Sequence, residues 1–255
     1  MKKLLLIAAI SLSLVSCAEL MQIANTMGTS GLNTGNTVTE AENIMGLKSS
    51  LNFGIDHAVN LLGVENGFMN DAILKLVLPE EAQTIVKNIK LIPGGQALVD
   101  KAVLSLNRSA EDAVKEATPI FKSAISKMTF SDAMGILFGG NNAATDYLKK
   151  TTYNDLQAAF APKVKASLAK PLVANVSTTQ SWNSLTSAYN TVASSPVGAI
   201  ANLKAVNVNL ENYVTQKALD ALFIKVAEEE KNIRTNPVAR VTSLLQRVFG
   251  QLDKK

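Results

Sequence analysis

The strongest constraint on the fold is a helical spacing of apolar residues that begins at residue 40. Thr39 and Glu42 have the spacing of a capping box, in which each side chain bonds the other residue's backbone N–H at a helix start. The apolar residues that follow lie within about 40° of Leu51 on a helical projection. They are Ile44, Leu47, Leu51, Ile55, Ala58 and Leu62. The sequence therefore predicts a helix that buries one narrow stripe and ends at Gly63.

Helix starts and stops recur along the rest of the chain. Pro79 followed by two acids is typical of a first helical turn, and Pro93-Gly94-Gly95 of a helix end. The pattern predicts helices over residues 96–118, 119–128, 129–138, 142–150, from 152 onward, 172–192, 209–234 and 236–250. Pro162 is expected to bend or restart its helix, and residues 194–208 to form a loop. We therefore predict an all-α fold: a single multi-helix globular domain over residues 40–250 and a disordered tail over 251–255.

Residues 1–16 have the features of a secretory signal peptide. Two lysines precede an apolar run from Leu4 to Leu14, which is too short to span a hydrocarbon core of ~30 Å. The run ends in Leu14-Val15-Ser16-Cys17, which resembles the lipobox of bacterial lipoproteins. The resemblance implies cleavage before Cys17, the only cysteine of the chain, and acylation of its thiol and new amino group.

This resemblance also implies a location. Asp directly after the cysteine retains such proteins at the inner membrane of enteric bacteria, so Ala18 implies an outer-membrane lipoprotein. We expect its domain to be on the periplasmic face. Residues 17–39 are rich in Gly, Thr, Asn and Ser without periodicity, which predicts a flexible N-terminal tether. The predicted partner is thus a membrane, reached through lipidated Cys17.

Charge and composition exclude several classes of function. Without the two lysines of the signal, 23 basic residues face 21 acidic ones, so the chain is nearly neutral. A nucleic-acid binder needs a dense basic surface, and we predict no nucleic-acid partner. A single histidine and a single cysteine exclude multi-histidine metal sites and an intrachain disulfide. We predict no metal and no cofactor.

Four short stretches, in one order, carry a resemblance to a known family. They are Leu61-Leu62-Gly63 with Asn66-Gly67-Phe68, Asn107-Arg108-Ser109-Ala110-Glu111, Ala144-Thr145-Asp146-Tyr147-Leu148, and Phe160-Ala161-Pro162-Lys163-Val164. Together they resemble the bacterial domain-of-unknown-function family 4197, whose members are mostly secreted or lipid-anchored proteins of Gram-negative bacteria. Leu148 departs from the Phe that members often have there. The family has no established activity, so the resemblance implies no catalytic residue.

The helix predicted over residues 96–118 carries the candidate site. Its apolar residues occupy two faces, which indicates a helix covered on both sides with a partly buried polar group. In a functional interpretation Arg108 is an anion clamp oriented by Glu111 or Asp100, with Asn107 beside it. In the alternative interpretation this face is solvated, and i,i+4 pairs join Arg108 to Asp112 and Glu111 to Lys115.

A second candidate surface is aromatic. Phe121, Phe130, Phe138, Tyr147, Tyr153 and Phe160 fall at junctions between predicted helices. Such residues fill a core, or they line an apolar groove together with Met128 and Met134. In the groove interpretation Asn66-Gly67-Phe68 is a recognition loop at its edge.

Two functions from different classes follow from these features. His57 lies about 120° from the core stripe and is expected to be exposed, so a Ser-His-Asp or Cys-His device is not available. We therefore predict a lipid-anchored, non-catalytic binding module for an envelope protein or an apolar small ligand. The alternative is a small periplasmic hydrolase that uses Asp or Glu with Arg108.

Overall fold

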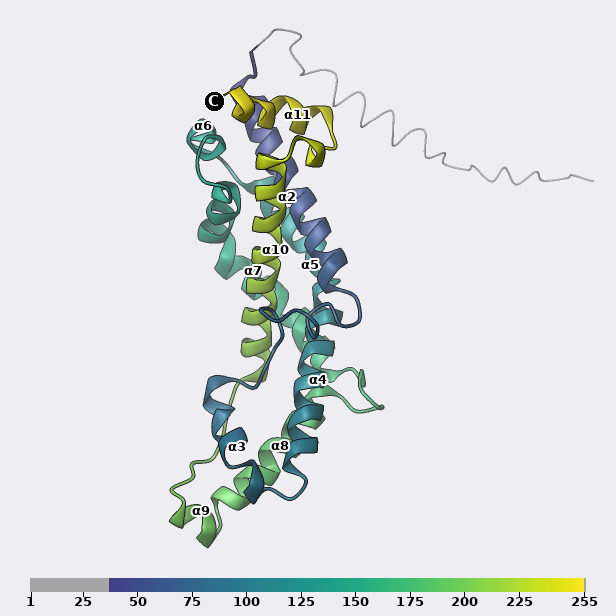
Figure 1. Ribbon diagram of the computed structural model, residues 1–255, viewed down its shortest axis with the longest axis vertical. Helices are drawn as coiled ribbons and strands as arrows, with labels where there is room; N and C mark the ends of the chain where they lie inside the picture. Colours follow the sequence, from purple (N-terminus) through teal and green to yellow (C-terminus); the bar gives the residue numbers. More distant parts are fainter. Residues whose placement is uncertain (1–36, 255) are drawn as a thin grey trace, which may run out of the picture.

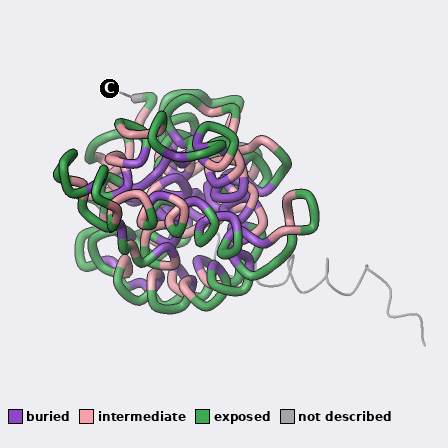
Figure 2. The backbone as a smooth tube through the Cα atoms, turned by 90° about the horizontal axis from the view of Figure 1, so that it is seen from below, coloured by how far each residue is buried: buried purple, intermediate pink, exposed green. Residues whose placement is uncertain are grey.

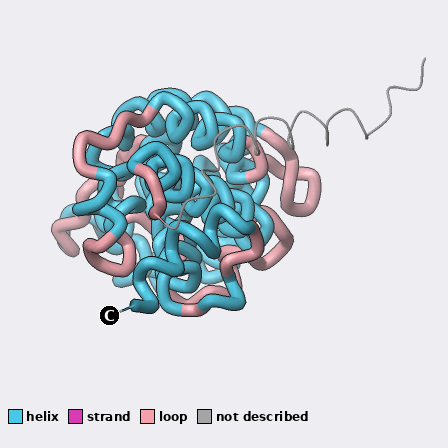
Figure 3. The backbone as a smooth tube through the Cα atoms, turned by 90° about the horizontal axis from the view of Figure 1, so that it is seen from above, coloured by secondary structure: helices cyan, strands magenta, loops and turns pink. Residues whose placement is uncertain are grey.

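The computed structural model describes residues 37–254 and confirms the all-α prediction. This part of the chain forms ten α-helices and no strand. Figure 3 colours its helices cyan and the segments between them pink. The predicted signal peptide, Cys17 and most of the predicted tether lie outside the described residues.

The elements follow one another in the order drawn in Figure 1. The longer helices are α2 (Glu40–Leu62), α4 (Gly95–Val114), α5 (Ala117–Lys127), α7 (Ala143–Ala169), α8 (Thr178–Ala193) and α10 (Leu210–Thr235). The short α-helices are α3 (Gln83–Lys87), α6 (Ala133–Leu137), α9 (Pro196–Ile200) and α11 (Ser243–Phe249). The 3-10 segments are η1 (Glu80–Ala82), η2 (Ile89–Leu91), η3 (Pro237–Ala239) and η4 (Gly250–Lys254).

The helices form an elongated molecule with two differently built halves (Figure 1). In one half α10 packs between α2 and α7, and α11 covers the start of α2. In the other half α4 packs against α8. Because α7 contacts both α10 and α4, it joins the two halves. The start of α2 and the C-terminus lie at one end of the molecule, and α9 lies at the other.

The predicted stripe of α2 is the centre of the core. Leu47, Leu51, Ile55 and Ala58 have no exposed surface and Leu62 is 1% exposed, whereas Ile44 is partly buried. The predicted capping box is present, since the Thr39 side chain accepts the Glu42 N–H and Glu42 accepts the Thr39 N–H. In Figure 2 the buried residues likewise gather along the interior of the helical array. Burial of this stripe against α10 stabilises the fold by the hydrophobic effect.

One predicted helix break is wrong: α7 is continuous from Ala143 to Ala169 and contains Pro162. Instead of capping a new helix, the Thr152 hydroxyl donates to Leu148 O at 2.7 Å, one turn back in the same helix. Phe160 and Val164, on either side of the proline, have no exposed surface. Tertiary packing on both sides therefore keeps the helix together where proline removes one backbone bond.

Two predicted boundaries shift because of local turns. The helix predicted over 96–118 ends at Val114, and α5 begins at Ala117 with Pro119 in its first turn. The helix predicted from residue 172 begins at Thr178, because Ala174 and Asn175 have φ of 48° and 58° and form a turn. A capping box of Ser177 and Gln180 then starts α8.

The predicted loop and the predicted tail both contain helical turns. Within residues 194–208, Ser195 caps the short helix α9 by accepting the Gly198 N–H at 3.3 Å. Residues 251–254 of the predicted disordered tail belong to η4, and Asp253 accepts a hydrogen bond from Arg240 at 2.9 Å. This ion pair holds the last turn against the domain, so the chain does not fray at residue 251.

Candidate functional site

Three of the four predicted site residues on α4 bind one segment, the loop of residues 64–78 that follows α2. Asn107, Arg108 and Glu111 contact this loop directly. Asp100 does not join them: it is exposed and accepts a hydrogen bond from Gln96 at 2.8 Å. The structure therefore brings together three residues of the predicted site and separates the fourth.

Glu111 is buried, with 3% of its surface exposed. Its Oε1 accepts the backbone N–H groups of Phe68 at 3.2 Å and Met69 at 3.3 Å. Its Oε2 accepts from Arg108 Nη1 at 2.7 Å. A carboxylate buried in this way is stabilised by one cation and two backbone donors, all of them within the protein.

Arg108 extends the contact to the start of the loop. Its Nη2 donates to Glu65 Oε1 and to Asn66 Oδ1, each at 3.0 Å. Asn66 has a φ of 68°, a left-handed conformation that Asn tolerates better than most residues. The guanidinium thus holds a tight turn that would otherwise be strained.

Asn107 fixes the extended part of the loop. It has no exposed surface, and its side-chain amide accepts from Leu76 N at 2.9 Å and donates to Leu76 O at 2.8 Å. These two bonds are of the kind that the backbone of an adjacent strand would make with Leu76. Leu74, Leu76 and Leu78 of this segment are buried, while Ile73 and Val77 are exposed.

Asn107, Arg108 and Glu111 therefore form a clamp, meaning that they hold the 64–78 loop against α4. The alternative interpretation, a solvated face with i,i+4 ion pairs, is wrong in the pairs that it predicts. Glu111 pairs with Arg108 and not with Lys115. Asp112 lies 2.6 Å from Lys170 Nζ and accepts from the Ser167 hydroxyl, and these two partners lower the pKa of Asp112 against the opposing effect of burial. The charged atoms of Arg108 and Glu111 face the protein's own backbone and side chains.

A second buried carboxylate, which sequence reasoning missed, binds the start of α7. Glu230 on α10 has no exposed surface, and it accepts the N–H groups of Ala144 at 2.9 Å and Thr145 at 2.7 Å. Arg234, one turn along, donates to Glu230 at 2.8 Å and to Leu137 O at 2.6 Å. The only signal in the sequence was the i,i+4 spacing of Glu230 and Arg234, which is more typical of an exposed pair.

A third buried carboxylate is Glu42 of the capping box. Its Oε2 accepts the Thr39 N–H at 2.8 Å, and its Oε1 lies 3.0 Å from Arg247 Nε on α11. The Thr39 N–H lowers the pKa of Glu42 most, burial raises it, and Arg247 lowers it further. The predicted cap therefore also joins the two termini of the domain.

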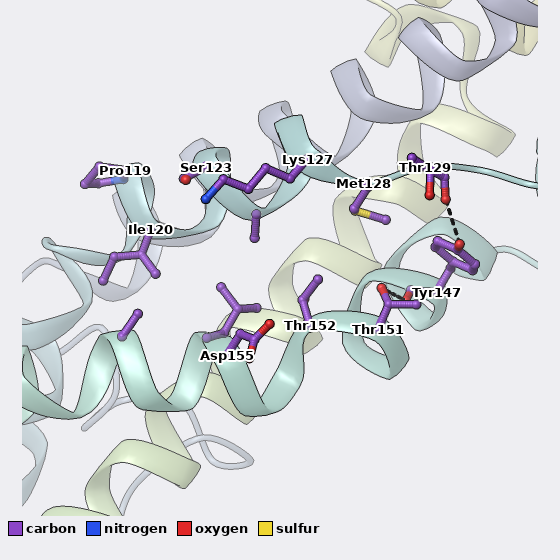
Figure 4. A pocket seen from close by; sticks show the side chains of 13 residues that line it. Pro119, Ile120, Ser123, Lys127, Met128, Thr129, Tyr147, Thr151, Thr152 and Asp155 are labelled. Carbon is purple, nitrogen blue, oxygen red and sulfur yellow. Dashed lines mark hydrogen bonds between the residues drawn. The ribbon is translucent and has the colours of Figure 1, made fainter.

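A largely apolar groove lies between α5 and α7. Its volume is about 630 Å³. Pro119, Ile120, Ala124 and Met128 line it from the α5 side, and Tyr147, Leu156 and Ala159 from α7. In Figure 4 the labelled Ile120 and Met128 on the α5 side lie across the opening from Tyr147 and Asp155 of α7. The small side chains of Ala124 and Ala159 leave the space open where two helices pack.

The polar groups of the groove differ in their availability. The Tyr147 hydroxyl donates to Thr129 O at 2.7 Å and closes one end, and the Thr152 hydroxyl is bonded within α7. Lys127 lies on the α5 wall and Asp155 on the α7 wall (Figure 4). The groove therefore combines an apolar floor with one cationic and one anionic side chain at its walls.

The groove interpretation of the aromatic residues is correct only for Tyr147, with Met128 beside it, and the core interpretation is correct for the other five aromatics. Tyr147 and Met128 line the groove. Met134 is on α6, where its sulfur lies 2.9 Å from Asn43 Nδ2. The other aromatic residues are buried or packed against the core: Phe121, Phe130, Phe138, Tyr153 and Phe160. Phe68 has no exposed surface, so Asn66-Gly67-Phe68 is not a recognition loop.

His57 is exposed, as predicted, and its Nε2 lies 4.0 Å from Glu229. Among residues 37–254, His, Cys, Asp and Glu side chains form no group of three or more that would hold a metal ion. None of the helices in this range is long and apolar enough to cross a membrane.

The architecture and these sites define the class: an all-α protein with an apolar surface groove, whose buried carboxylates bind its own loops and helix starts. The chain belongs to the family described as a protein of unknown function (DUF4197), whose sequence profile matches residues 37–250. This confirms the family resemblance. Comparisons with curated proteins and with solved structures give no match.

Proposed function

We propose that this protein is a lipid-anchored protein of the cell envelope whose helical domain binds a small apolar ligand between α5 and α7. The observation that carries the binding proposal is the α5–α7 groove. Its volume of about 630 Å³ is within the range of small-molecule sites, roughly 300–1,000 Å³.

The shape and chemistry of the groove indicate the class of ligand. The floor from Ile120 to Met128 spans eight residues of helix, about 12 Å at 1.5 Å per residue. This favours an elongated apolar group such as an acyl chain. Lys127 and Asp155 at the walls favour a polar or zwitterionic head at the opening. Binding is then driven by apolar burial and oriented by the two charges.

The anchor is proposed from the sequence. The lipobox resemblance supports acylation of Cys17, and Ala18 supports sorting to the outer membrane. The domain is proposed to face the periplasm. A single acyl chain binds a bilayer only marginally, so the two or three chains of this class of lipoprotein are what make the attachment stable.

The hydrolase alternative receives no support from the geometry. It requires Arg108 and a nearby acid to face a substrate, yet Arg108 and Glu111 bind the 64–78 loop. We therefore propose a non-catalytic role.

The groove is tested by filling it. Ala159→Phe places a ring in the groove, whereas Ala158→Phe adds the same ring at an exposed position of α7 that does not line it. Residues 18–255 secreted into the periplasm are compared by native mass spectrometry and by fluorescence of the apolar probe N-phenyl-1-naphthylamine. We expect a bound mass and probe binding in the wild type and in Ala158→Phe, and neither in Ala159→Phe. A ligand-free wild type that does not bind the probe would contradict the proposal and direct the search to protein partners.

The anchor is tested separately by Cys17→Ala. We expect this variant to accumulate as an unprocessed, unacylated precursor. Normal processing and normal membrane attachment of the variant would show that the protein is not a lipoprotein.

A further inference from the structure

The turn between α10 and α11 has its apolar residues outside and its charged residue inside. In residues 236–242, Val238 is 86% exposed and Val241 is 66% exposed, whereas Arg240 between them is only 2% exposed. A surface turn usually has the opposite arrangement, since burial of a guanidinium is costly unless it is fully bonded.

Arg240 is fully bonded, and its bonds fix the turn. It donates to Ile233 O at 2.9 Å and to Arg234 O at 3.0 Å, and it pairs with Asp253. At the start of the turn Asn236 Oδ1 accepts the Val238 N–H at 3.1 Å. Because the turn is already ordered, contact through its valines costs little conformational entropy.

Residues 236–242, which we call the valine turn, lie at the same end of the molecule as Thr37, the first residue that the structure describes. Arg247 on α11 donates to Thr37 O at 3.2 Å and pairs with Glu42, so the first described residues are bound to α11. Figure 1 shows the start of α2, the end of α10 and α11 together at this end, with α9 at the other.

We infer that Val238 and Val241 form a contact surface for a lipid bilayer, which orients the domain on the membrane with this end inward. The inference rests on the proposed lipid anchor. From Cys17 to Thr37 a random coil extends about 25 Å on average, so the valine turn stays within reach of the bilayer. Burial of two valines favours a docked state by about a hundredfold, too little for a free protein but sufficient when a tether raises the local concentration.

The test supplies the tether artificially, so that it does not depend on natural acylation. Residues 18–255 contain no cysteine. An N-terminal hexahistidine attaches this chain to phosphatidylcholine vesicles that contain a nickel-chelating lipid. Val238→Cys carries an environment-sensitive dye, and Ile200→Cys on α9, where the native residue is 88% exposed, is the matched control at the far end.

Val238→Cys leaves one of the two valines, which alone favours docking by about tenfold. We therefore expect attachment to lower iodide quenching of the dye at position 238 by about tenfold, which corresponds to roughly 90% docking, and to leave position 200 unchanged. Equal protection at both positions, or none at either, would overturn the inference. A dye at exposed Ser243→Cys provides a second readout: its protection should disappear when Val238→Ser and Val241→Ser are added. Protection that persists in this variant would also overturn it. If the dye is not protected while Cys17→Ala still blocks processing, the contact surface is rejected and the proposed lipid anchor is not.

Discussion

Three buried glutamates perform the same task at different points of the chain. Glu42, Glu111 and Glu230 each accept at least one backbone N–H and each pair with an arginine. The arginine offsets the buried charge, and the backbone bonds fix the segment that supplies them. Removal of one partner leaves the other charge buried and unpaired, which costs more than the pair itself contributes.

We predict that Glu111→Ala lowers the free energy of unfolding by about 2–4 kcal/mol, because it leaves Arg108 and the N–H groups of Phe68 and Met69 without their carboxylate. Arg108 keeps its ion pair with exposed Glu65, which limits the loss of stability. Asp100→Ala is the matched control on the same helix, and it should change stability by no more than about 0.5 kcal/mol. Urea unfolding measures the stability of both variants. Equal stability of the two would contradict the conclusion that Glu111 holds the 64–78 loop.

The lowered pKa of Glu42 predicts the direction in which the free energy of unfolding changes with pH. The unfolded chain protonates this residue near its usual value of 4.5, before the folded chain does. Its contribution to stability is therefore complete above pH 4.5 and is lost as the pH falls through the lower folded pKa. Unfolding free energies measured from about pH 7 to pH 3 should fall less steeply below about 4.5 in Glu42→Gln than in the wild type. Parallel curves would contradict this prediction.

At the scale of elements, close approach of α2 to its neighbours depends on glycine. A Cβ on Gly46 would lie 2.6 Å from the side chain of Val248 on α11, and one on Gly54 would lie 3.0 Å from Val226 on α10. These distances are shorter than ordinary van der Waals contact. The two glycines therefore set the spacing of three helices.

We predict that Gly46→Ala destabilises the protein by about 1–3 kcal/mol through overpacking, even though alanine favours the helix by about 0.5–1 kcal/mol. Gly250→Ala is the matched control, because its Cβ meets nothing within 4 Å and its φ of −62° suits any residue. That substitution should be neutral or stabilise by about 0.4–1 kcal/mol. Thermal denaturation of both variants measures the difference, and a stabilised Gly46→Ala would show that α11 moves aside.

Helix starts were easier to predict than helix continuity. Asn209 caps α10 as predicted, by accepting the Asn212 N–H. The helix predicted from residue 129 starts later, because Asp132 is its cap and accepts the Gly135 N–H. A cap depends on residues within one turn of each other, so the sequence contains the whole signal. The continuity of α7 through Pro162 depends instead on α4, α5 and α10 packed around it.

At the scale of the whole molecule, one core connects both halves. The buried cluster extends from Leu47 and Phe249 at one end to Leu185 and Trp182 on α8 in the other half. Because α7 contacts helices of both halves, loss of either half exposes part of the shared core. We infer that the two halves unfold together.

Trp182, the only tryptophan, reports on the half that contains α8. We predict that its fluorescence and the helical circular dichroism signal give coincident urea transitions, as a two-state domain requires. The buried indole, 5% exposed, makes the fluorescence change large. An earlier fluorescence transition would show that the α4–α8 half unfolds independently.

The sequence by itself determined the all-α class, the α2 core stripe, several helix caps and the family, because each depends on residue spacing or on short motifs. It also placed Asn107, Arg108 and Glu111 on one polar face of α4. Only the tertiary structure decided that this face binds residues 64–78, that Glu230 binds the start of α7, and that a groove opens between α5 and α7. These features join residues more than 40 positions apart in the bonds of Glu111 and more than 80 in those of Glu230. The physical reason is that helix periodicity and capping act within a turn or two, whereas the partner of a buried charge and the shape of a groove depend on how helices pack.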